Sequence, residues 1–119
     1  MYVLNVIVAG LLGGSFLLLG IGKLADVTMM AEARAHLGLP AGLFKVIGIL
    51  EMFGGAGVLV GLHQDLPVIG VLAAIGLIGM TIGAGFYHQK AGDTMKERLP
   101  AVLMGSIAIF YAILRIATA

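Results

Sequence analysis

The chain has 119 residues, of which 61% are hydrophobic and 11% are charged, and its mean hydropathy is +1.12. The polar side chains of a soluble domain this small could not cover so much apolar surface, so the composition predicts a membrane protein. The net charge of +1 provides no basic patch for a nucleic acid, and the absence of cysteine excludes disulfides, cysteine-ligated metals and thiol chemistry.

Four apolar segments each have about the 20 residues that a membrane-spanning helix needs. They cover residues 3–22, 41–62, 68–87 and 100–118. The first segment has no basic n-region and no small-residue cleavage site, so we expect it to stay in the protein rather than to be removed as a signal peptide. The expected fold is all-α, a single four-helix transmembrane bundle over residues 1–119 that passes through the cell membrane several times.

Prolines and one glycine mark the helix boundaries. Pro40, Pro67 and Pro100 are expected at or just before the first turns of the second, third and fourth spans, where a missing N–H costs nothing. In residues 23–39, apolar residues recur near helical spacing between charged ones. This pattern predicts a short amphipathic helix in the membrane interface, ended by Gly38, and the alternative is an ordinary charged connector.

Glycine is abundant, with 19 residues, most of them inside the spans. Small residues four apart let membrane helices approach closely. Three pairs have this spacing and are the candidate packing positions: Gly10 and Gly14, Gly57 and Gly61, and Gly79 and Gly83. A weak repeat of the sequence Leu-Pro-Ala at 39–41 and 99–101 also indicates a two-plus-two arrangement of the spans.

Positive charge is distributed unevenly between the two sides. Six of the seven Lys and Arg residues fall on the side of the two longer loops, and only Arg115 falls on the other side, where it is expected to be an interfacial anchor. The positive-inside rule predicts that the longer loops are cytoplasmic and that both termini lie outside.

Glu51 is the most informative residue, because it lies near the middle of the second span. An ionisable group at that depth costs several kcal/mol, so it is expected to face the interior of the bundle and to meet a partner or to serve binding or transport. Its candidate partners are Lys23, reaching inward, and Tyr111 on the fourth span.

Three further polar residues are expected at the same end of the bundle as Glu51. Lys23 ends the first span, Lys45 begins the second, about 9 Å from Glu51 along the helix axis, and His88 ends the third. The four residues are candidates for one ligand-binding or proton-linked pocket, together with Tyr111. The alternative is that Lys23, Lys45 and His88 extend to the lipid headgroups, as polar residues at helix ends often do.

No nucleotide-binding, metalloprotease or hydrolase motif is present, so the sequence offers no catalytic residue and no metal site. Among the three histidines, only His36 and His88 could converge on a metal or haem. No covalently bound cofactor is expected.

The sequence resembles the DoxX-like family of small four-helix membrane proteins over nearly its whole length. The resemblance rests on GIGKL at the end of the first span, GLPAGLFKVIGILEMFGGAGVLVGL through the second, MTIGAGFYHQKAGD at the end of the third and YAILR at the end of the fourth. It implies a four-helix bundle with Lys23, Lys45, Glu51 and His88 as the family's polar positions. Relatives include subunits of a thiosulfate:quinone oxidoreductase, members of oxidative-stress complexes and assembly chaperones of receptor channels.

Two functional hypotheses follow. In the first, the polar cluster binds a quinone or another lipophilic ligand, and the protein is an accessory subunit of a membrane redox system whose partner supplies electrons. In the second, it is a non-catalytic scaffold or assembly chaperone whose glycine faces dock other membrane helices, from a partner or from a second copy. Because the chain is minimal and lacks cysteine, the resemblance does not extend to independent catalysis.

Overall fold

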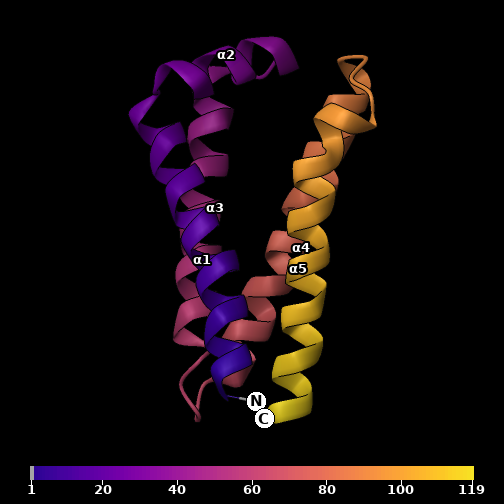
Figure 1. Cartoon of the computed structure of the whole chain (residues 1–119). Coiled ribbons are helices and arrows are strands. Elements are labelled where there is room, and N and C mark those ends of the chain that lie inside the picture. The colour runs from indigo at the N-terminus through magenta and orange to yellow at the C-terminus, as the bar shows by residue number, and fades with distance from the viewer. Residues whose placement is uncertain (1) are drawn as a thin grey trace.

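The computed structural model describes residues 2–119, which form five helices (Figure 1). Four are long and apolar enough to cross a membrane: α1 (Tyr2–Ala25), α3 (Ala41–Val60), α4 (Pro67–Lys90) and α5 (Met95–Thr118). The short α2 (Thr28–Leu37) connects α1 to α3. The predicted all-α fold with four spans, and a short helix between the first two, is confirmed.

The long helices form two pairs. α1 packs along α3 and α4 packs along α5, whereas the pairs are joined mainly by α3 against α4, with fewer contacts between α1 and α5. The pairs meet at the end where both chain termini lie and diverge toward α2 (Figure 1). This is the two-plus-two arrangement that the weak repeat indicated.

Glycines allow α1 and α3 to approach closely. A Cβ atom on Gly13 would lie 2.8 Å from the carbonyl oxygen of Gly55, and one on Gly48 would lie 3.0 Å from that of Gly20. A larger residue at these positions would push the two backbones apart. Close backbone contact matters here because the hydrophobic effect does not drive helices together in lipid, and van der Waals packing must do so.

Tyr111 closes the end at which the two pairs meet. Its side chain is fully buried on α5, and its hydroxyl donates a hydrogen bond of 2.7 Å to the carbonyl oxygen of Val58 on α3. The same hydroxyl lies against Gly61 and Gly70, where any Cβ would collide with it. The end of α3 and the start of α4 are therefore packed directly against α5.

The glycine pairs predicted from spacing are only partly correct. Gly57 and Gly61 do lie at close approaches, to Ala73 and to Gly70. The prediction is wrong within this chain for four positions, because no atom lies within 4 Å of a Cβ built on them: Gly10, Gly14, Gly79 and Gly83. Spacing identifies a helix face but does not say which face meets the neighbouring helix.

Most of the predicted boundaries hold, but one differs. Pro67 is in the first turn of α4, Pro40 is the N-cap of α3, and Gly38 ends α2 in the left-handed conformation with φ 70°. Pro100, however, lies inside α5, which begins five residues earlier at Met95. The cause is a capping box, in which Thr94 and Glu97 satisfy each other's backbone N–H groups and start the helix upstream of the proline.

Candidate functional site

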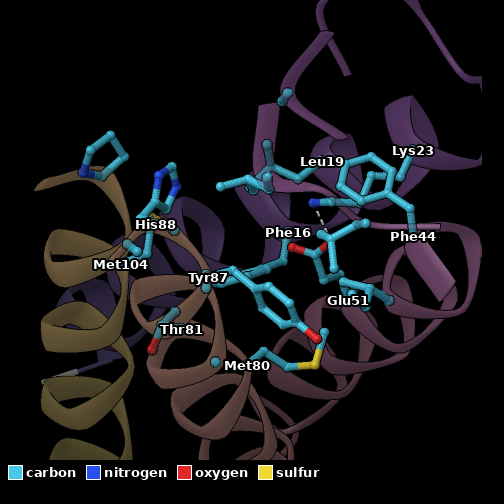
Figure 2. Close-up of a pocket in the computed structure, with 18 of the residues that line it drawn as sticks. Phe16, Leu19, Lys23, Phe44, Glu51, Met80, Thr81, Tyr87, His88 and Met104 are labelled. Carbon is cyan, nitrogen blue, oxygen red and sulfur yellow. Dashed lines mark ion pairs between the residues drawn. The ribbon is translucent and has the colours of Figure 1, made fainter. Parts of the chain in front are cut away.

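A cleft of about 480 Å³ lies between the two helix pairs on the side toward α2 (Figure 2). All five helices contribute to its walls. The lining is mostly apolar, with Phe16, Leu19, Phe44, Met80 and Met104 among its side chains. Gly76, Gly79 and Gly83 on α4 also line it, so the two open glycines of the predicted third pair keep the cleft wide instead of packing helices.

Glu51 lies on the α3 wall of this cleft, where it forms an ion pair with Lys23. The Lys23 Nζ atom is 2.5 Å from Glu51 Oε1, and the two side chains are only 12% and 7% exposed. Figure 2 shows the two side chains pointing toward each other from α1 and α3. Lys23 also lies over the Phe44 ring, 5.2 Å from its centroid, and this cation–π contact helps to hold the ammonium at the wall.

The ion pair follows from how the sequence folds locally. Lys23 is in the last turn of α1, where the unpaired carbonyls of the helix end favour a cation. Its Cβ atom packs against Gly48, one turn before Glu51 on α3, so the glycine contact between the helices sets the distance between the two charges. Replacing water around both charges is costly, and mutual attraction offsets that cost only when the pair is this close.

His88 and Tyr87 line the opposite wall, near the end of α4 (Figure 2). His88 Nδ1 is 2.6 Å from Asp93 Oδ2, and His36 Nε2 on α2 is 2.7 Å from Asp93 Oδ1. One carboxylate thus joins α2 to the end of α4 beside the cleft. The convergence of His36 and His88 that the sequence allowed occurs, with an aspartate between them.

Asp93 was missed by the sequence analysis. It follows Gly92, which has φ 80° and turns the chain back after α4, and its backbone N–H donates to the His88 carbonyl at 2.9 Å. Hydrogen bonds from His88 and then from His36 hold the pKa of the Asp93 carboxyl below its ordinary value. A histidine five residues before an aspartate, with a glycine turn between them, is the signal that could have identified the contact.

The structure separates two of the five candidate site residues from the cleft. Lys45 is exposed on α3 and does not line the cleft, which fits the alternative that it extends to the headgroups. Tyr111 is on the correct helix but lies in the closed end, where it bonds Val58 instead of Glu51. Lys23, Glu51 and His88 are the members of the predicted cluster that line the cleft.

Arg115 also differs from its prediction as an interfacial anchor. It is buried on α5, and its Nε donates a hydrogen bond of 2.9 Å to the carbonyl oxygen of Gly61. This bond ties the last turn of α5 to the end of α3. This contact could not be predicted from the sequence, because it depends on α5 crossing the turn after α3.

The cleft can hold a molecule that is mostly apolar and carries one polar end. Aromatic, methionine and glycine positions supply a flexible apolar lining, and the Lys23–Glu51 pair supplies both a donor and an acceptor at one wall. Pockets of this kind, with an apolar surface and few polar groups, are typical of small-molecule sites.

Comparison with known proteins assigns the chain to a family. The model of the DoxX-like family matches residues 7–110, which include every residue of the cleft described above. No curated protein and no solved structure matches the chain. Four spanning helices and this match over most of the sequence show that the chain is a multi-pass membrane protein that belongs to the DoxX-like family.

Proposed function

We propose that this protein binds a lipophilic molecule with a polar head, such as a quinone, in the cleft between its two helix pairs. The observation that supports the proposal is the buried Lys23–Glu51 pair in the wall of an apolar cavity of about 480 Å³. That volume falls within the range of about 300–1,000 Å³ that small-molecule pockets occupy.

The polar groups of the cleft suit the head group of a quinone. The Lys23 ammonium can donate a hydrogen bond to a quinone carbonyl, and the Glu51 carboxylate can accept one from the hydroxyl of the reduced form. In this proposal the protein is an accessory subunit of a membrane redox system. A partner protein supplies the electrons, and Glu51 and His88 exchange the matching protons with the bound molecule.

The test is mass spectrometry of the lipids and quinones that purify with the intact protein. Gly79→Leu should fill the cleft and reduce ligand retention about tenfold or more, because a Cβ there points into open space. Gly10→Leu is the matched control, since Gly10 is also open but is exposed on α1 outside the cleft. Equal ligand content in both variants, or no ligand in the wild type, would overturn the proposal.

A second candidate function is supported by the open glycines of α1. Gly10 and Gly14 are four residues apart, and neither has a neighbour within 4 Å of a built Cβ. Such a face can receive a helix of a partner protein or of a second copy, as a scaffold or assembly chaperone would require. For this function the roles of the two variants are reversed. Gly10→Leu should abolish co-purification of the partner, or self-association measured by light scattering. Gly79→Leu should leave both unchanged.

A further inference from the structure

A buried arginine lies at the closed end of the bundle, away from the cleft. Arg115 is only 5% exposed, and it donates one hydrogen bond from Nε to Gly61 and one of 3.2 Å from Nη1 to the Thr118 hydroxyl. A guanidinium carries five N–H donors, and the hydrogen bonds to Gly61 and Thr118 use two of them. Among residues 2–119, no carboxylate lies within 4 Å of this guanidinium.

Arg115 lines a second pocket, of about 550 Å³, together with the last residue, Ala119, and no aspartate or glutamate side chain lines it. Asn5 and Thr118 line it as well, with His63 and Gln64 from the turn after α3. The Asn5 amide nitrogen donates a hydrogen bond of 3.2 Å to Thr118, but its buried Oδ1 accepts none within the described residues. The pocket therefore offers the Arg115 guanidinium and one hydrogen-bond acceptor, Asn5 Oδ1, that has no partner among the described residues.

A buried cation without a counter-charge is strongly unfavourable, so the site is suited to an anion. The planar guanidinium fork matches the oxygens of a phosphate, and the Asn5 acceptor can receive a hydroxyl of the same ligand. Arg115 is one turn from the end of a spanning helix, which is the depth at which headgroup phosphates lie. We propose that the Arg115 pocket binds a phosphate group, supplied either by a membrane phospholipid or by a free phosphate ion.

The test compares three forms of the full chain. Wild type, Arg115→Gln and Lys96→Gln are released from nanodiscs containing phosphatidylglycerol and phosphatidylcholine, and native mass spectrometry measures how much phosphatidylglycerol each retains. Lys96 is the matched control, because it is an exposed cation at the other end of the same helix. In a parallel arm, inorganic phosphate is added in detergent and the unfolding temperature is recorded.

We expect Arg115→Gln to lower phosphatidylglycerol retention about tenfold, because charge-assisted hydrogen bonds are lost, and Lys96→Gln to leave it unchanged. A phosphate-dependent rise in the unfolding temperature of the wild type that is absent from Arg115→Gln would identify a free phosphate ion as the ligand. Retention of phosphatidylglycerol without that rise would identify the phospholipid as the ligand. If Arg115→Gln does not fold, Arg115→Lys decides, since it keeps the charge but loses the fork. Unchanged retention in the variant that folds, or no effect of lipid and phosphate on the wild type, would overturn the proposal.

Discussion

At the scale of single residues, the chemistry of the cleft depends on two charges that stabilise each other. Glu51 and Lys23 are both largely withdrawn from solvent and lie 2.5 Å apart. Removing one partner of a buried pair leaves the other charge uncompensated, whereas removing both leaves a neutral apolar wall. The pair is therefore a point where stability and ligand recognition can be separated by experiment.

We predict that Glu51→Gln lowers the free energy of unfolding by about 3–5 kcal/mol, because it leaves the Lys23 ammonium without a counter-charge in the wall of the cleft. The double variant Lys23→Met with Glu51→Gln should be more stable than Glu51→Gln alone. Unfolding in a detergent series measures both. Lys45→Met is the control, since Lys45 is exposed and should change stability little. A double variant that is no more stable than Glu51→Gln alone would show that the two charges do not stabilise each other.

At the scale of elements, Asp93 connects α2 to the end of α4. Its two carboxylate oxygens form hydrogen bonds with the rings of His36 and His88, and the Asp93 side chain is only 8% exposed. Glu97, at the start of α5, is a second carboxylate near Asp93 and repels it. Because α2 covers part of the cleft, this contact fixes one side of the opening.

We predict that the contact weakens in acid. The folded-state pKa of Asp93 is lowered, so its stabilisation is complete above the ordinary aspartate pKa of about 3.9 and is lost as the pH falls through the lower folded-state value. Spin labels on Ala35→Cys and Gln89→Cys report the distance between α2 and α4, and the distribution should stay narrow down to about pH 4 and broaden only as the pH falls further. With Asp93→Asn it should be broad throughout. A distribution in the native chain that is already broad at pH 5, or a narrow one for Asp93→Asn, would contradict this role.

The elements also show what the sequence could and could not predict. Span lengths, the start of α4 at Pro67 and the interior position of Glu51 follow from composition and local rules, and Lys23 was correctly named as a possible partner. Tyr111 was not correctly placed, because the rotation of α5 about its axis depends on packing at the closed end. The predicted start of the fourth span at Pro100 was wrong because the Thr94 capping box, whose T-x-x-E signature is present in the sequence, starts α5 earlier.

A pocket at the polar end of the bundle was predicted from the sequence, but its position between the two helix pairs could not be. It exists because α1 packs on α3 and α4 on α5 more closely than the pairs pack on each other. Spacing does not identify the glycines that bring α1 and α3 together: Gly48 has no glycine four residues away, and Gly79, which has one, faces open space. Only the relative rotation of the helices separates the two classes.

At the scale of the whole molecule, the orientation in the membrane remains a prediction. Six of the seven Lys and Arg residues lie toward the α2 end, so this end, with the opening of the cleft, should be cytoplasmic. The chain has no cysteine, and single cysteines can therefore report the topology. An impermeant thiol reagent applied from outside should label Gln64→Cys in intact cells, and should label Gln89→Cys only after the membrane is opened. The reverse pattern would contradict the orientation.

The most direct measurement of ligand binding uses the absence of tryptophan from the chain. Phe44→Trp places a fluorophore in the cleft beside Lys23, and Leu43→Trp places one at the same depth on an exposed face of α3. On titration with a quinone in nanodiscs, we predict saturable quenching of the tryptophan at position 44 near one quinone per protein, and only linear quenching by dissolved quinone at position 43. Linear quenching of equal slope at both positions would contradict a binding site in the cleft.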